Sequence, residues 1–192
     1  MAALQYVHSV YPQKNTAYVL WGQSIGAGVA TGLVARHAEG GIATTEAKGV
    51  QGMILETPFL SVKSMLLAMY PQKWLPYRYL WPFLRSWWDS EDAVRRIGGS
   101  KHEKATATST STTTTTTRRR THSLPILILS AEHDELVPPG QAEVLEKLCH
   151  EVGISDVEHV IVSGALHNDA SARGEGMGAI VRFLKRVGQG DV

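Results

Sequence analysis

Short apolar runs alternate with helical patterns along most of the chain. The apolar runs have the length of β-strands and lie at residues 18–21, 50–55, 124–130 and 157–162. Helical patterns with apolar residues on one face, or with many small residues, lie at residues 2–10, 28–37, 90–98, 141–152 and 177–187. Strands that alternate with helices are typical of a parallel sheet with helices packed on its faces, so the pattern predicts an α/β fold.

The first apolar run ends in a Gly-x-Ser-x-Gly motif centred on Ser24. A strand that passes through this motif into a helix is the sequence form of a nucleophile elbow, a sharp turn that presents the serine. Gly22 and Gly26 let the strand and the helix approach closely, and the serine can hold an unfavourable backbone conformation. The N–H of Ile25 is the expected donor to an oxyanion. The alternative is that the motif forms an ordinary turn in which Ser24 has no catalytic role.

The third and fourth apolar runs each end in a loop that contains candidate catalytic residues. Asp134 follows the third run, with Glu132 and Glu135 as competing acids, and His167 follows the fourth in a loop that begins with glycine. A serine hydroxyl needs a base, which a histidine supplies, and a carboxylate orients the histidine. Active groups gather at the carboxyl ends of parallel strands. The pattern therefore predicts a Ser-acid-His triad.

Three other residues have expected roles outside the triad. His133 could be a loop or wall histidine, and Asp169 is expected to brace its loop rather than to serve as the triad acid. The helix that starts near residue 90 has Ser90 as its expected N-cap and ends at Gly98 and Gly99.

An aromatic-rich segment spans residues 59–98. It holds nine of the fourteen aromatic residues between Phe59 and Trp88, and Pro71, Pro76 and Pro82 interrupt it, so one long helix is excluded. The segment is expected to be a helical excursion that packs on the domain, and it could also form a lid over an apolar pocket above Ser24. The two roles are compatible.

A low-complexity tract at residues 105–121 is expected to be a disordered insertion. Eleven of the twelve residues from Thr106 to Thr117 are serine or threonine, and three arginines follow at 118–120. Such a composition buries little apolar surface. Deletion of residues 105–120 is therefore expected to leave folding nearly unchanged, and an anion-binding role for the arginines is the lesser alternative.

Composition narrows the possible partners. The net charge of +1 gives no reason to expect a nucleic acid, and no apolar run approaches the ~20 residues that span a bilayer. The first residues lack the order of a signal peptide, so the chain is expected to be soluble as it stands. Cys149 is the single cysteine, so no internal disulfide is possible, and the histidines lack metal-ligand spacing. No cofactor or metal is expected.

The motif segments at residues 22–28, 56–61, 130–139 and 164–169 resemble the α/β-hydrolase superfamily, and within it the Bem46-like branch of serine hydrolases. The resemblance covers residues 16–187 apart from the Ser/Thr tract, and the order serine, aspartate, histidine is that of the superfamily. It implies a triad of Ser24, Asp134 and His167 that cleaves an ester, thioester or amide. The aromatic segment indicates an apolar acyl group, so the expected substrate is an apolar small molecule or acyl compound. Full-length relatives resemble membrane-anchored proteins.

The chain departs from this family at its start. Family members begin with several strands and with a His-Gly-rich loop that supplies a second oxyanion donor, and neither precedes Met1. The chain is therefore expected to be a partial domain that lacks its N-terminal strands, exposes the edge of the first strand, and is a weak, marginally soluble hydrolase. The rival hypothesis is a catalytically inert family member that serves as an interaction module.

Overall fold

The computed structural model describes residues 6–7, 9–10, 18–38, 50–69, 88–106 and 124–189. Within these ranges a four-stranded parallel sheet has the order β1-β2-β3-β4. Its strands are β1 (Tyr18–Gln23), β2 (Val50–Glu56), β3 (Ile126–Ala131) and β4 (Val157–Val162). The predicted α/β fold with a parallel sheet is confirmed, and β1 lies at one edge of the described sheet.

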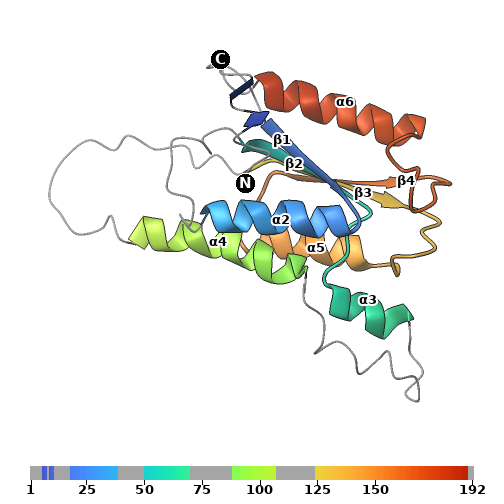
Figure 1. The fold of residues 1–192 in the computed structure, drawn as a ribbon, viewed down its shortest axis with the longest axis horizontal. Helices are drawn as coiled ribbons and strands as arrows, with labels where there is room; N and C mark the ends of the chain where they lie inside the picture. The colour runs from blue at the N-terminus through green and yellow to red at the C-terminus, as the bar shows by residue number, and fades with distance from the viewer. Residues whose placement is uncertain are drawn as a thin grey trace, which may run out of the picture.

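Helices cover both faces of the sheet (Figure 1). The helices on one face are α2 (Ile25–Ala38), α4 (Ser90–Thr106) and α5 (Gln141–Glu151), and α6 (Gly174–Gln189) lies on the other. The short helix α3 (Val62–Met69) follows β2 and lies near the end of the sheet at which the strands end. None of the helices in these described ranges is long and apolar enough to cross a membrane.

The strand β3 shows why a continuous apolar run forms a central strand. Its residues Ile126 and Ile128 pack into the core beneath α2, α4 and α5, whereas Leu127 and Leu129 pack into the core beneath α6. All four side chains are fully buried. Because successive strand residues point to opposite faces, a sheet covered on both faces needs apolar residues at every position.

Phe183 of α6 is the largest side chain of the second core. It is fully buried, and its ring lies over Gly52 of β2, where a Cβ would be only 3.0 Å from Phe183 Cζ.

Replacing Phe183 with Ala is expected to lower the free energy of unfolding by about 3–5 kcal/mol, because the cavity cannot fully close. Urea denaturation measures this. The neighbouring Leu184, 43% exposed, is the control, and its change to Ala is expected to cost less than about 0.5 kcal/mol. Equal losses would contradict the assignment of the core.

Cys149 lies in the first core on α5 and is fully buried. Burial raises the pKa of its thiol to about 12, and the nearby Glu146 carboxylate adds to the rise. Because the thiolate is the reactive form, the folded protein is expected to react with dithionitrobenzoate at neutral pH only very slowly. In urea the same thiol is expected to react at once. Rapid reaction of the folded protein would show that this core opens readily.

The predicted boundaries of α4 are wrong at both ends. The Asp89 carboxylate accepts the N–H of Asp92 at 2.9 Å, so Asp89 rather than Ser90 caps the helix. The helix does not end at Gly98, because there the glycine provides close packing instead of a stop. A Cβ on Gly98 would overlap the side chain and carbonyl of Val152 at the end of α5.

The other helices that the structure describes differ from the predicted ones mainly in where they begin and end. The structure begins α2 at Ile25 instead of residue 28, and α6 at Gly174 instead of residue 177. Most of the helix expected at residues 2–10, the centre of the aromatic-rich segment at residues 70–87, and the Ser/Thr tract from residue 107 lie outside the described residues.

Candidate active site

Ser24 lies in a tight turn between β1 and α2. Its φ angle of 52° lies in the left-handed region that non-glycine residues avoid. Its N–H donates to the Glu56 carbonyl at 2.9 Å, and its carbonyl accepts the N–H of Ala27 at 3.0 Å. A Cβ on Gly22 would overlap the Gly26 carbonyl, so only glycine fits at this position. The strained serine and the close approach of strand and helix have the form expected of a nucleophile elbow.

Ile25 is the first residue of α2. Its N–H has no carbonyl one turn earlier within the helix, and the first turn holds no acidic side chain that would compete for it. The positive end of the helix dipole adds to the attraction for an anion here. The backbone is thus suited to receive negative charge next to Ser24.

The structure brings Asp134 and His167 into direct contact. Both carboxylate oxygens of Asp134 lie 3.0 Å from His167 Nδ1. Asp134 Oδ1 also accepts the backbone N–H groups of Leu136 at 2.9 Å and Val137 at 2.7 Å, which fixes the carboxylate. His167 is 3% exposed. Because the carboxylate engages Nδ1 as a hydrogen-bond acceptor, Nε2 is left to act as a base.

The histidine loop is held against the elbow by its backbone. The His167 carbonyl accepts Gln23 Nε2 at 3.3 Å and Thr57 Oγ1 at 3.5 Å. Gln23 immediately precedes Ser24, so the serine and the histidine lie at the same edge of the sheet. Among the described residues, no hydrogen bond joins the Ser24 hydroxyl to the His167 ring. Such bonds are often long until substrate binds.

The competing acids bond to the backbone of the same loops rather than to the His167 ring. Glu132 Oε2 accepts the N–H of Gly164 at 2.7 Å, and Glu135 Oε2 accepts the N–H of His167 at 3.1 Å. Asp169 Oδ1 accepts the N–H of Leu166 at 2.6 Å, and its hydrogen bond to Arg173 lowers the pKa of the Asp169 carboxyl. These carboxylates brace the loops, and His133 is an exposed loop residue.

Glu56 is a residue of the site that the sequence did not single out by itself. It ends β2 and is 3% exposed. Its carboxylate accepts the N–H of Ser171, beyond His167, at 2.9 Å and Trp21 Nε1 of β1 at 3.2 Å, while its carbonyl holds Ser24. Glu56 therefore ties the elbow to the histidine loop. The only signal for it was its place in the motif segment 56–61.

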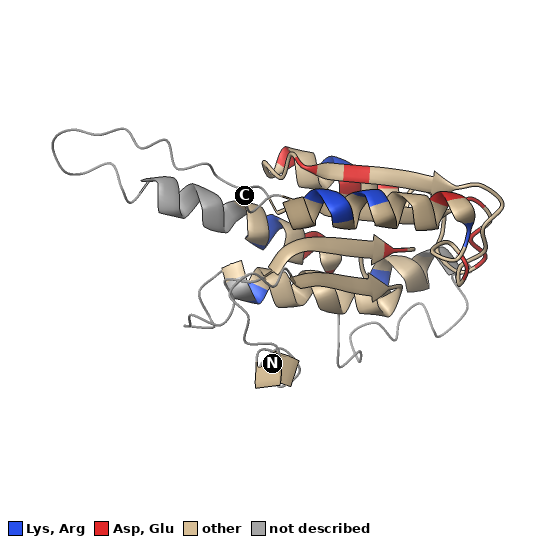
Figure 2. Ribbon diagram, turned by 90° about the horizontal axis from the view of Figure 1, so that it is seen from above, with Lys and Arg blue, Asp and Glu red and all other residues tan. Residues whose placement is uncertain are grey.

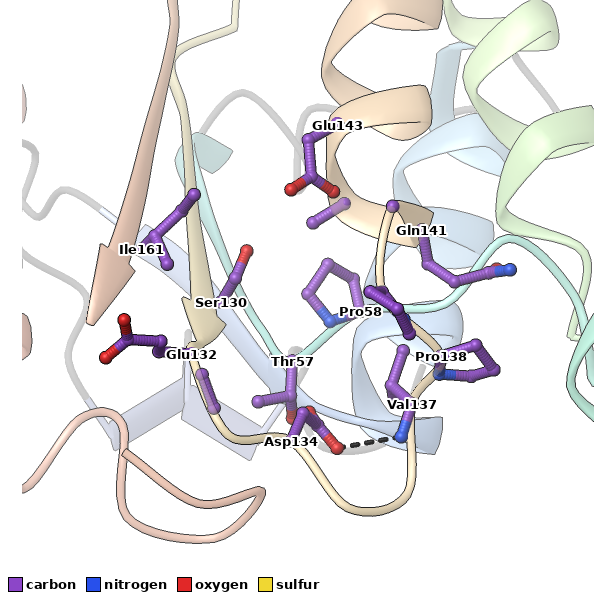
Figure 3. A pocket seen from close by; sticks show the side chains of 14 residues that line it. Thr57, Pro58, Ser130, Glu132, Asp134, Val137, Pro138, Gln141, Glu143 and Ile161 are labelled. Carbon is purple, nitrogen blue, oxygen red and sulfur yellow. Dashed lines mark hydrogen bonds between the residues drawn. The ribbon is translucent and has the colours of Figure 1, made fainter. Parts of the chain in front are cut away.

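A cavity of about 310 Å³ lies beside these loops. Figure 3 shows it between the end of β3, the turn after β3 and the start of α5. Thr57 and Asp134 line it, whereas Ser24 and His167 do not, so it lies behind the acid and not above the serine. No group of three or more His, Cys, Asp or Glu residues in the described ranges is placed to hold a metal ion.

Solved structures show the class to which the fold belongs. An esterase of Pyrococcus furiosus superimposes with a TM-score of 0.59 at 16% identity, over 96% of this chain and 58% of the esterase. An α/β-hydrolase of Vibrio vulnificus gives 0.57 at 18% identity, over 93% and 52%. Acyl-protein thioesterase 2 of Zea mays gives 0.53 at 14% identity, over 97% and 64%. The fold is that of the α/β-hydrolases.

The sequence comparisons give the family within this class. Residues 2–169 match the family described as serine aminopeptidase, S33, and the chain belongs to that family. It is also similar to protein bem46 of Schizosaccharomyces pombe, with 29% identity over 147 residues. That match covers 77% of this chain and 37% of the yeast protein, so the chain spans well under half of this relative's length.

Proposed function

We propose that the protein is a serine hydrolase that cleaves an ester, thioester or amide through an acyl-enzyme on Ser24. The single observation that carries this proposal is the Asp134–His167 pair, joined at 3.0 Å and held against the turn that contains Ser24. Membership of a serine hydrolase family supports it. The activity of the whole protein is part of the proposal, because the chain spans only part of its relatives.

Each residue has a chemical role in the proposed reaction. The Ser24 Oγ attacks the substrate carbonyl while His167 Nε2 takes the hydroxyl proton, and Asp134 stabilises the resulting imidazolium. The Ile25 N–H donates to the oxyanion. When the tetrahedral intermediate collapses, the alcohol, thiol or amine leaves with the proton from His167. Water then attacks the acyl-enzyme by the same route and releases the acid.

The acyl group is proposed to be apolar. An esterase and a thioesterase are among the structures with this fold, and both act on acyl compounds. The aromatic-rich segment 59–98 is proposed to cover the acyl group, since it follows β2 and starts beside Thr57, at the edge of the sheet where Ser24 lies. Aromatic side chains offer large apolar surfaces to such a group.

A second function, an interaction module without turnover, is favoured by one observation. Among the described residues the Ser24 hydroxyl is not hydrogen-bonded to the His167 ring. A serine hydroxyl that no base activates is a weak nucleophile. A catalytically inert protein with this fold would keep the contacts between the loops but would not cleave a substrate.

Pre-steady-state kinetics with p-nitrophenyl butyrate separate the two functions. The serine hydrolase is expected to release a rapid burst of p-nitrophenol, followed by slower steady release as the acyl-enzyme hydrolyses, and the steady release is expected to be lost in the Ser24→Ala variant. A matched thioester and anilide then show which bond is cleaved fastest. Absence of both burst and steady release in folded protein would overturn the hydrolase and leave the interaction module.

A further inference from the structure

A second serine-histidine-carboxylate relay lies apart from Ser24. Ser130 Oγ of β3 lies 2.5 Å from His159 Nε2 of β4, and His159 Nδ1 lies 2.9 Å from Glu146 Oε2 of α5. Ser130 pairs with Ile161 in the sheet, so His159 is two residues earlier on β4 and points to the same face. The helix α5 packs on that face and brings Glu146 to the histidine.

The relay has a buried base and an accessible serine. The side chain of His159 is only 7% exposed, and that of Glu146 is 33% exposed. Ser130 is partly buried and lines the 310 Å³ cavity (Figure 3). A small molecule in this cavity would therefore meet the Ser130 hydroxyl, with the base and the carboxylate behind it.

The two hydrogen bonds specify one protonation pattern. The Glu146 carboxylate is an acceptor, so His159 Nδ1 carries the proton that it accepts, and Nε2 then accepts the proton of the Ser130 hydroxyl. A nucleophile within hydrogen-bond reach of a base, which a third group orients, is the arrangement that activates a serine. In this structure the Ser130 hydroxyl is hydrogen-bonded to the His159 ring, whereas the described residues contain no such bond between the Ser24 hydroxyl and the His167 ring.

We propose that Ser130 is a second nucleophile, which takes an acyl group from a small activated ester bound in the cavity. Ser130 Oγ forms a bond to the ester carbonyl carbon while its proton passes to His159 Nε2. The bond from that carbon to the leaving oxygen breaks, and the leaving group departs as an alcohol with the proton from His159. The products are acyl-Ser130 and a free alcohol.

The cavity wall sets the class of ester. Pro58, Val137 and Ile161 supply apolar surface, whereas Glu132 and Glu143 bring carboxylates to the lining (Figure 3). Acidic residues also gather in the loops that follow β3 and β4 (Figure 2). Negative charge in a cleft repels anions, so the ester is neutral or cationic. The cavity holds only about 310 Å³, so the acyl chain is short.

The test uses the Ser24→Ala variant, in which the first nucleophile is absent. The folded variant is treated with p-nitrophenyl acetate, and acetylated peptides are mapped by mass spectrometry over time. Acetylation of Ser130 is expected to be faster than that of Ser155 and Ser163, two exposed serines that serve as internal controls. Adding His159→Gln is expected to slow acetylation of Ser130 by about 10²-fold, since a general base contributes at least this much.

Three outcomes would overturn the proposal. They are absence of acetyl-Ser130, acetylation of Ser130 no faster than that of the two exposed serines, and an unchanged rate in the His159→Gln variant. A mono-succinyl ester of p-nitrophenol, which carries a negative charge, tests the ester class and is expected to acylate Ser130 more slowly than the acetyl ester. Equal rates would overturn the proposed exclusion of anions.

Discussion

Replacing Ser24 with Ala is expected to lower kcat for p-nitrophenyl butyrate by up to about 10⁶. Removal of a triad nucleophile typically costs this much, because turnover through the acyl-enzyme on that serine is lost. The substituted residue keeps the backbone of the turn, whose two hydrogen bonds involve the N–H and the carbonyl of residue 24. Folding is therefore expected to be nearly unchanged.

Steady-state rates, taken after any initial release equimolar with the protein, measure this effect. Ser163→Ala is the matched control, because Ser163 is an exposed serine in the loop that precedes His167. Its rate is expected to equal that of the wild type. Similar turnover by wild type and Ser24→Ala, with both proteins folded, would remove Ser24 from the mechanism.

Replacing Asp134 with Asn is expected to lower kcat by about 10⁴. The amide oxygen can still accept the N–H groups of Leu136 and Val137, so the turn is expected to persist. The amide carries no charge to stabilise the imidazolium, and its N–H₂ group favours the wrong tautomer of His167. The loss should therefore appear mainly in kcat and little in KM.

Glu135→Gln is the control for this substitution. Glu135 contacts the backbone N–H of His167 and not its ring, and the amide oxygen of Gln can accept the same N–H. A loss of less than about tenfold is expected, as for a residue that contributes position rather than general acid-base chemistry. If Glu135→Gln were as damaging as Asp134→Asn, the assignment of the acid would be wrong.

The parts of the fold that could be predicted are those set by local pattern. The bounds of β4 agree with the prediction, residues 157–162, and the strands β1 to β3 agree within one or two residues. Both faces of the sheet are covered, so the central strand β3 appears as an almost continuous apolar run. The Gly-x-Ser-x-Gly motif could also be interpreted from local sequence, because the close contact that requires glycine at residue 22 is with the carbonyl of Gly26, four residues later.

The features that the sequence could not indicate depend on contacts between distant residues. Gly98 looks like a helix stop until α5 is placed against it, and Val152 then explains the glycine. Glu56 reaches Ser171, 115 positions away, and Ser130 reaches His159 only because β3 and β4 pair in one register. The pattern of polar and apolar positions along the chain does not indicate which residues of two strands pair. The acid at residue 134 needed the family resemblance for the same reason.

Covalent labelling tests the central claim most directly. The folded protein is treated with a fluorophosphonate probe, and the modified residue is identified by peptide mapping, with His167→Gln as the matched variant. The account predicts an adduct on Ser24 whose formation is slowed by about 10²-fold or more when His167 is replaced, because the histidine acts as the base. A folded protein that carries no adduct on Ser24, or one labelled there at the same rate without His167, would contradict it.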